Sequence, residues 1–248
     1  MDSKRARFAV SLVDLTDLSD DCDITAIDEL CGRAATYGTA AVCVWPDFVA
    51  QAARALAGSP VAVATVVNFP SGTERAHAVG IITRQAVADG ADEIDVVLPY
   101  TDFAAGRTAR SADVLDGVRS ATDGSALMKV ILETGELSDV DAVERASRFA
   151  IEHGADFIKT STGKTPVSAT PEAAETMLRV IAGTARPVGL KPSGGIRSAA
   201  DAERYLTLSD EIMGAGWLSP ATFRFGASGL LSALLVAVEP AGDADGTT

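Results

Sequence analysis

Short apolar runs alternate with Ala-rich helical stretches along most of the chain, and this alternation limits the fold more than any other feature. The runs are rich in β-branched residues and are typical of strands. They span residues 40–46, 61–69, 93–99, 127–134, 157–163, 188–195, 211–218 and 223–228. The stretches between them have helical spacing and end in Gly before the next run. Such repeats predict parallel strands joined by right-handed crossovers.

Eight strands in 248 residues predict an α/β fold, a single-domain (β/α)8 TIM barrel. A doubly wound open sheet is the alternative that the pattern leaves open. Only a short turn separates the runs at 211–218 and 223–228. We expect one domain over residues 1–248. Within it, residues 1–39 form an extra N-terminal helical segment and residues 240–248 a mobile tail.

The charge balance of the chain limits its partners. Apolar residues make up 47% of the sequence and charged residues 22%, which is enough apolar material for a packed core. The net charge of −13 disfavours non-specific binding to nucleic acid. A phosphorylated ligand therefore needs a local positive site against an acidic background.

The cysteine pattern and the lack of a long apolar segment predict a cytoplasmic protein. Cys22, Cys31 and Cys43 form no CxxC pair and are odd in number, so a disulfide framework is not expected. The N-terminus does not resemble a signal peptide. The most apolar run, 230–238, is too short to cross a bilayer and is typical of a buried helix. We therefore expect no membrane partner.

Histidine is scarce in this chain. His77 and His153 are the only two histidines, and each lies in a polar context. This scarcity disfavours a His-rich zinc site and a Ser-His-Asp triad.

Charged residues occupy inward positions on four of the predicted strands. Residues of a strand alternate between its two faces. The face that packs on the helices needs apolar side chains, so the charged face must point into the barrel. By this rule Asp95, Lys129, Lys159 and Lys191 meet in one interior.

Two interpretations fit these buried charges, because a buried charge is costly unless it is paired. In the first, Asp95 and Glu133 balance the lysines in a structural ion network, which is the favoured explanation for Lys129.

In the second interpretation, a lysine acts as a nucleophile. A free lysine has a pKa near ~10.4 and is protonated at neutral pH. A second ammonium within roughly 4 Å adds on the order of 4 kcal/mol of repulsion, enough to lower the pKa by about 3 units. Two inward lysines on neighbouring strands therefore predict an activated amine.

Glycine-rich loops follow three of the late strands. The segment "STGKT" lacks the first Gly of a P-loop, since Ile158 stands at that position. Gly194–Gly195 follows a strand, and the segment 226–229 precedes an apolar helix. Gly163 and Lys164 complete the set. Loops of this kind bind anions through backbone N–H groups, and barrels often bind phosphate in their last loops.

Two segments carry a resemblance to a known family. "ADFIKTSTGK" (155–164) and "VGLKPSGGIR" (188–197) resemble, at their mutual spacing, those of the deoxyribose-phosphate aldolases, class I aldolases on a (β/α)8 barrel. The likeness extends from residue 14 to residue 231. It implies that Lys159 forms the Schiff base, Lys191 perturbs it and Asp95 transfers protons. It implies binding of the substrate phosphate by Gly163, Lys164, Gly194, Gly195, Gly226 and Ser228, and of the sugar hydroxyls by Thr16.

The implied reaction is reversible cleavage of 2-deoxy-D-ribose 5-phosphate to D-glyceraldehyde 3-phosphate and acetaldehyde, in deoxyribonucleotide catabolism. No metal and no other cofactor is implied. The expected partners are a small phosphosugar and an aldehyde, with no nucleic acid and no membrane; a homodimer is left open. The alternatives are another Schiff-base aldolase or transaldolase, and a non-catalytic barrel that binds phosphosugars.

The chain departs from the family at two points. Gly229 stands where several members have Ser, which removes one hydroxyl near the phosphate. The C-terminal tail lacks the tyrosine that ends some members. Cys43 could lie near the site, although a small core residue is the favoured interpretation.

Overall fold

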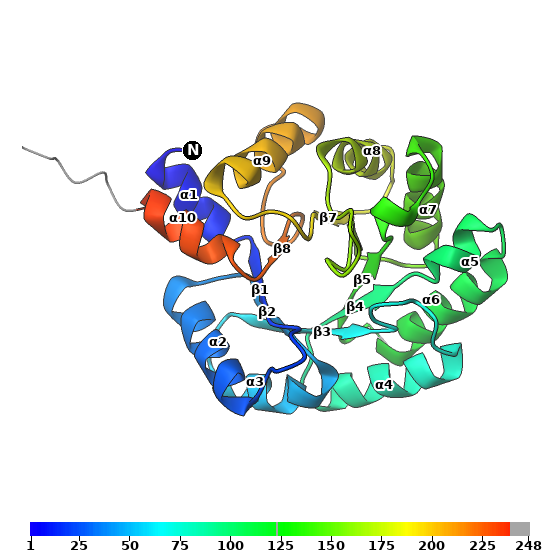
Figure 1. Cartoon of the computed structure of the whole chain (residues 1–248), viewed down its shortest axis with the longest axis horizontal. Coiled ribbons are helices and arrows are strands. Elements are labelled where there is room, and N and C mark those ends of the chain that lie inside the picture. The colour runs from blue at the N-terminus through cyan, green and yellow to red at the C-terminus, as the bar shows by residue number, and fades with distance from the viewer. Residues whose placement is uncertain (123, 239–248) are drawn as a thin grey trace, which may run out of the picture.

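In residues 1–122 and 124–238, which the computed structural model describes, eight parallel strands form a barrel surrounded by helices (Figure 1). The strands are β1 (Val13–Thr16), β2 (Ala41–Val44), β3 (Ala62–Val67), β4 (Glu93–Val97), β5 (Leu127–Ile131), β6 (Phe157–Lys159), β7 (Gly189–Lys191) and β8 (Phe225–Ala227). The helices are α1 (Ser3–Val10), α2 (Ile24–Tyr37), α3 (Val49–Ala55), α4 (Ala76–Ala88), α5 (Tyr100–Ala104), α6 (Thr108–Thr122), α7 (Val140–Glu152), α8 (Pro171–Ala182), α9 (Ala199–Met213) and α10 (Leu230–Val238), with 3-10 turns η1 (Pro46–Phe48) and η2 (Thr134–Glu136). The (β/α)8 prediction is confirmed. The expected tail, 240–248, lies outside the described residues.

Hydrogen bonds between β7 and the segment that enters β8 close the barrel. The Leu190 N–H donates to the Thr222 carbonyl at 2.9 Å, and the Arg224 N–H donates to the Leu190 carbonyl at 3.0 Å. Strand β8 also pairs with β1. The sheet therefore has no open edge, and the open-sheet alternative is wrong. The carboxyl ends of all eight strands meet at one rim.

The structure corrects the prediction of strands in two places. Residues 1–39 are not wholly helical, because they contain β1 (Val13–Thr16). This strand is four residues long and carries Asp14, so its apolar signal is weak. The predicted strand at 211–218 does not exist. Helix α9 continues to Met213, and Gly214 and Gly216 then turn the chain with positive φ angles.

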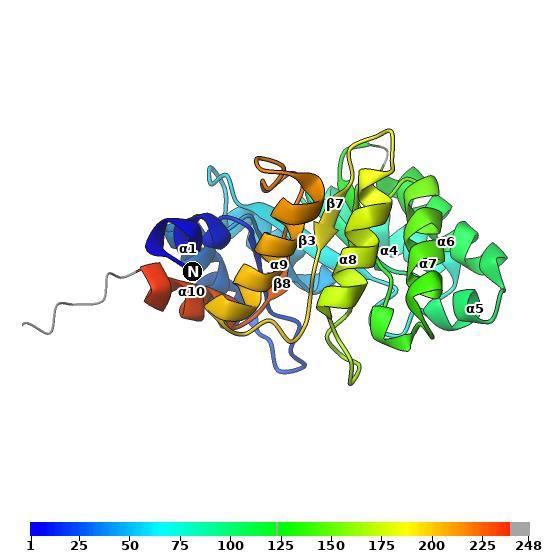
Figure 2. The same cartoon turned by 90° about the horizontal axis from the view of Figure 1, so that it is seen from above.

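Helices α1 and α10, the first and last helices of the described residues, together complete one side of the helical ring. Helices α1 and α10 lie side by side (Figure 1). The Ser3 hydroxyl donates to the Val238 carbonyl at 2.8 Å, and Arg5 pairs with Asp210 of α9 at 2.6 Å. Helices α7, α8 and α9 pack in sequence along another side of the barrel (Figure 2). Helix α1 is the part of the N-terminal segment that adds to the eight-fold pattern.

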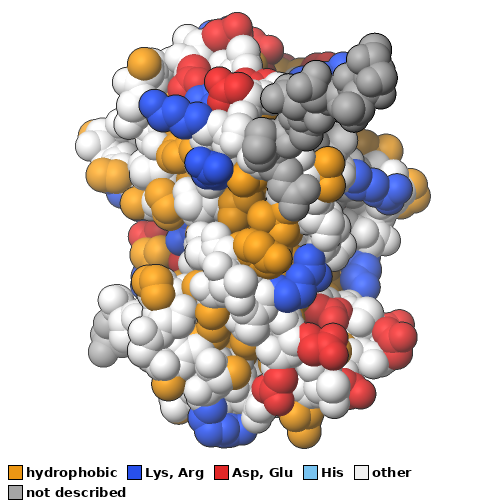
Figure 3. All heavy atoms as spheres, turned by 90° about the vertical axis from the view of Figure 1, so that its left-hand side faces the viewer, with side chains coloured by type: hydrophobic (Ala, Val, Ile, Leu, Met, Phe, Trp, Pro, Cys, Tyr) orange, Lys and Arg blue, Asp and Glu red, His pale blue; other side chains and the backbone are white. Residues whose placement is uncertain are grey.

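The outer surface of the α1 and α10 side carries apolar side chains. Figure 3 shows these side chains grouped in the middle of that side, with charged side chains around them. Val236 of α10 is 74% exposed, whereas Leu230, Leu231 and Leu234 face the core. Among the described helices, none is both long enough and apolar enough to span a bilayer.

The barrel interior has an apolar side, formed mainly by β2 and β3. Ala41, Cys43, Ala64 and Val66 cluster there with Leu18. Cys43 is fully buried, and burial raises the pKa of its thiol. This agrees with the interpretation of Cys43 as a small core residue.

An aromatic ring fills the interior next to β7. Phe157 of β6 lies in register with Gly189 of β7. A Cβ atom at Gly189 would collide with the Phe157 ring. The Arg224 guanidinium lies over the same ring, 5.6 Å from its centroid. Gly189 is therefore required by close packing, and not by a turn.

We expect Gly189→Ala to destabilise the protein by about 1–3 kcal/mol, because overpacking forces neighbouring groups to move. Gly32→Ala is the matched control, since Gly32 is exposed within α2 and has open space around it. That change should stabilise the protein by about 0.4–1 kcal/mol through the unfolded chain. Thermal unfolding of both variants checks this, and shifts of the same sign would contradict it.

Candidate active site

The register of the strands brings the predicted charged residues together. Lys159 of β6 and Lys191 of β7 are direct neighbours across the two strands. Asp95 of β4 and Lys129 of β5 are neighbours in the same way. All four are inside the barrel, and each is less than 5% exposed. The alternation rule therefore placed all four correctly.

Asp95 is the centre of this group. Its Oδ2 atom accepts hydrogen bonds from the Nζ atoms of both Lys159 and Lys191, each at 2.8 Å. Its Oδ1 atom accepts from the Nζ of Lys129 at 2.9 Å. The two ammonium positions of Lys159 and Lys191 are thus within reach of one oxygen atom. Because each Nζ atom lies 2.8 Å from that oxygen, the two Nζ atoms are at most twice 2.8 Å apart.

A second layer of charges lies next to the first. Arg224 donates to Asp14 at 2.7 Å and to Glu93 at 2.8 Å. Asp14 also pairs with Lys191, and Glu93 pairs with Lys129 at 2.5 Å. Lys129 is therefore tied into a structural ion network, as the first interpretation of the buried charges expects.

The carboxylates that balance the lysines differ from those expected. Glu133 has no ion pair among the described residues, so its expected part in the network is wrong. Its backbone turns out of the strand with a φ of 54°, and its carboxylate accepts a hydrogen bond from the Thr162 hydroxyl. Asp14 and Glu93 take that place. The connected network holds four cations, Lys129, Lys159, Lys191 and Arg224, against three carboxylates, Asp14, Glu93 and Asp95.

At Lys191 and Asp95, neighbouring opposite charges shift the pKa more than burial does. Burial lowers the pKa of Lys191, but the carboxylates of Asp14 and Asp95 raise it more, so the pKa lies above its ordinary value. Burial raises the pKa of Asp95, but the three lysines lower it more, so it lies well below its usual range. Asp95 is therefore ionised and Lys191 charged at neutral pH.

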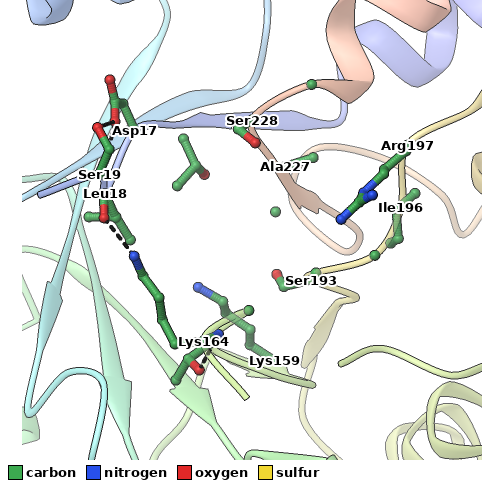
Figure 4. A pocket seen from close by; sticks show the side chains of 17 residues that line it. Asp17, Leu18, Ser19, Lys159, Lys164, Ser193, Ile196, Arg197, Ala227 and Ser228 are labelled. Carbon is green, nitrogen blue, oxygen red and sulfur yellow. Dashed lines mark hydrogen bonds between the residues drawn. The ribbon is translucent and has the colours of Figure 1, made fainter. Parts of the chain in front are cut away.

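A cavity of about 620 Å³ opens above this network at the carboxyl rim of the barrel (Figure 4). Lys159 lines the cavity, whereas Asp95 and Lys191 are fully buried below it. All seven residues predicted to bind substrate also line it: Thr16, Gly163, Lys164, Gly194, Gly195, Gly226 and Ser228. The structure therefore brings the whole predicted set to one place.

Two of the glycines are required by close approach. A Cβ at Gly194 would lie 2.6 Å from the Ser168 hydroxyl, and Gly194 has a φ of 81°. A Cβ at Gly226 would collide with the Ser193 side chain. Close packing against a serine therefore requires glycine at both positions, and both glycines line the cavity.

Sequence reasoning missed a cation of the cavity, Arg197. Lys164 and Arg197 lie on opposite sides of the cavity (Figure 4). The amine of Lys164 donates to the Leu18 carbonyl at 2.9 Å. The position of Arg197, directly after the Gly194–Gly195 loop, is the signal that could have found it. The cavity thus has a positive charge at each side in a chain that is acidic as a whole.

Within residues 1–122 and 124–238, no three Asp, Glu, His or Cys residues group in a way that could hold a metal ion. The carboxylates of the barrel interior are occupied by lysines and an arginine.

Comparisons with known proteins agree with this geometry. A model of the family described as "DeoC/LacD family aldolase" matches residues 8–234. A protein of Agrobacterium fabrum named deoxyribose-phosphate aldolase is 51% identical over 248 residues, which cover 97% of this chain and 95% of the relative. Among solved structures, an aldolase called QR15 is similar with a TM-score of 0.79 and 29% identity, over 92% of this chain and 95% of that one. A tetrameric deoxyribose phosphate aldolase from Aeropyrum pernix has a TM-score of 0.76 and 25% identity, over 93% and 91%. The chain therefore belongs to the DeoC/LacD family of aldolases.

Proposed function

We propose that this chain is a class I aldolase that cleaves 2-deoxy-D-ribose 5-phosphate to D-glyceraldehyde 3-phosphate and acetaldehyde. The observation that carries the proposal is the shared carboxylate oxygen of Asp95, bound by Lys159 and Lys191 at the base of a glycine-lined cavity. The name of the 51% identical relative supports the choice of substrate.

Lys159 is the nucleophile in this proposal. It attacks the C1 aldehyde of the open-chain sugar, and loss of water leaves an iminium ion. Only a neutral amine can attack, and the neighbouring Lys191 ammonium disfavours a second positive charge. Of the two amines, that of Lys159 reaches the cavity, whereas Lys191 is fully buried. Lys159 is therefore the amine that meets the substrate.

Asp95 and Lys191 serve the proton transfers. When the C2–C3 bond breaks, its electron pair moves into the iminium to give an enamine, and the C3 hydroxyl must lose its proton. Asp95 is a weak base, because the lysines hold its pKa well below the usual range. We therefore assign Asp95 and Lys191 to orienting a water molecule that carries the proton. Protonation of the enamine at C2 and hydrolysis then release acetaldehyde and restore Lys159.

The rim of the cavity binds the substrate phosphate. Lys164 and Arg197 supply opposing positive charges, and Ser228 and the backbone of Gly194 and Gly195 supply donors. Binding far from the reacting carbons orients the sugar over Lys159. Thr16 lies on the same cavity and is assigned to the sugar hydroxyls.

Two rival functions remain distinct from this proposal. Another Schiff-base aldolase or transaldolase would share the lysine chemistry but prefer a different sugar, which a substrate panel separates. A non-catalytic phosphosugar-binding barrel would bind the ligand without turnover. The buried charges below the cavity argue against the second rival, since an idle site has no use for a network that is costly to bury.

The location and the assembly stay predictions. We propose a cytoplasmic enzyme, as the cysteine pattern suggests. We propose that it self-associates at least to a homodimer, supported by the related Aeropyrum pernix enzyme, which is described as a tetramer. Analytical ultracentrifugation tests this.

We expect EDTA to leave the cleavage rate unchanged, because the iminium takes the electron pair that a metal ion would otherwise stabilise. The rate of acetaldehyde release from 2-deoxyribose 5-phosphate, with and without dialysis against EDTA, provides the measurement. Loss of activity that zinc restores would contradict the proposal.

We expect acetaldehyde and borohydride together to attach one ethyl group to Lys159, because reduction fixes the transient imine. Peptide mapping by mass spectrometry locates the adduct. Lys159→Arg serves as the control and should remain unlabelled. An adduct on Lys191 in the wild-type protein would reverse the two roles.

We expect Lys191→Leu to move the pH of half-maximal imine formation upward by about 2 units, because it removes the repulsion that favours a neutral amine beside it. The two carboxylates that Lys191 contacts would act in the same direction once they lose this partner. Lys191→Arg keeps the charge and should shift the profile less. An unchanged profile in Lys191→Leu would remove Lys191 from the mechanism.

A further inference from the structure

Glu133 is a buried carboxylate that the proposed mechanism does not use. It follows β5, is fully buried and makes no ion pair with a described lysine or arginine. Its backbone has a φ of 54° and a ψ of 60°, in the left-handed region that costs free energy for a residue other than glycine. A strained, buried acid at the carboxyl rim of the barrel suggests a specific task.

Among the described residues, the hydrogen bonds to the Glu133 carboxylate all come from the loop between β6 and α8. The Thr162 hydroxyl donates to Oε2 at 2.5 Å, and the Thr162 N–H lies 3.3 Å from the same atom. The Thr165 hydroxyl lies 3.1 Å from Oε1 and 3.0 Å from the Val167 carbonyl, so its one proton is shared between these two acceptors. The carboxylate thus holds two points of the loop on either side of Gly163 and Lys164, both of which line the cavity.

The hydrogen bonds continue from Glu133 into the phosphate side of the cavity. While the Thr162 hydroxyl donates to Glu133, its oxygen accepts from the Lys164 N–H at 3.1 Å. Glu133 therefore sets the direction of a hydroxyl that in turn orients the backbone of Lys164.

Close contacts fix the same loop from both neighbouring strands. On the β5 side, a Cβ at Gly135 would collide with Val167. On the β7 side, a Cβ at Gly194 would lie 2.6 Å from the Ser168 hydroxyl and 3.2 Å from the Cα of Gly163. The loop is packed between two glycines, and Glu133 supplies its polar anchor.

We propose that Glu133 is a positioning residue that shapes the β6–α8 loop for the substrate phosphate. This inference rests on the proposed function, because it takes the cavity rim as the phosphate site. Glu133 is not among the described residues that line the cavity. Its loss should therefore weaken recognition of the phosphate and spare the chemistry at Lys159.

The test compares phosphorylated and unphosphorylated substrates in Glu133→Gln. The amide keeps the size of the side chain, but one of its two ends is a donor and cannot accept from the loop. We expect KM for 2-deoxyribose 5-phosphate to rise by about tenfold, with kcat changed by less than about threefold. We expect kcat/KM for unphosphorylated 2-deoxyribose, and the rate of borohydride trapping with acetaldehyde, to change by less than about twofold.

Two further variants make the comparison specific. Glu136→Gln is the matched control, since Glu136 lies in the same turn, is exposed and undergoes the same chemical change. It should leave all three readouts unchanged. Thr165→Val removes one of the donors without changing a cavity-lining residue, and should reproduce part of the rise in KM. Its effect should not add to that of Glu133→Gln. Should Glu133→Gln fail to fold, Thr165→Val alone carries the test.

An equal loss of activity with and without the phosphate, or a rise in KM for Glu136→Gln as large as that for Glu133→Gln, would overturn the inference. A wild-type protein that prefers the unphosphorylated sugar would instead overturn the proposed function. The two failures are therefore distinguishable.

Discussion

Three lysine ammonium groups converge on the single carboxylate of Asp95, and the chemistry proposed for this enzyme depends on that contact. One carboxylate cannot neutralise three cations, and Asp14 and Glu93 satisfy only Lys191 and Lys129 in addition. Lys159 is left with a carboxylate oxygen that it shares with Lys191. Lys159 is also the one lysine of this cluster that lines the cavity.

The barrel stabilises this buried network because it holds most of the charged residues on rigid strands. Ions are costly to bury unless geometry and hydrogen bonds compensate, and adjacent parallel strands fix the spacing of the partners. Arg224 completes the arrangement by pairing with Asp14 and Glu93. Above the network, the loops of the carboxyl rim form the cavity, so the proposed reactive amine and the proposed phosphate site are positioned by different parts of the fold.

The repetition of strand-like and helix-like segments was sufficient to predict the fold class, and face alternation within the strands was sufficient to predict the inward lysines, because both are local patterns. Prediction failed where the pattern was short or interrupted. Strand β1 escaped notice because Asp14 interrupts a run of four residues. Arg224 lies in the predicted run at 223–228, but the strand itself begins only at Phe225 and has three residues, which is too short for alternation to settle its direction. Glu133 was placed among the lysines because a left-handed backbone angle cannot be read from alternation. Ion pairs such as Lys191–Asp14 and Arg224–Glu93 join residues far apart in the sequence, so they can be identified only once the barrel is closed.

The most direct test is selective labelling of the lysines at neutral pH. Formaldehyde with cyanoborohydride modifies neutral amines, and peptide mass spectrometry reports the extent at each position. The account predicts that Lys159 is modified fastest at neutral pH, while Lys191 and Lys129 stay unmodified. Equal protection of Lys159 and Lys191 up to the alkaline range would show that the crowding does not activate the amine and would contradict the account.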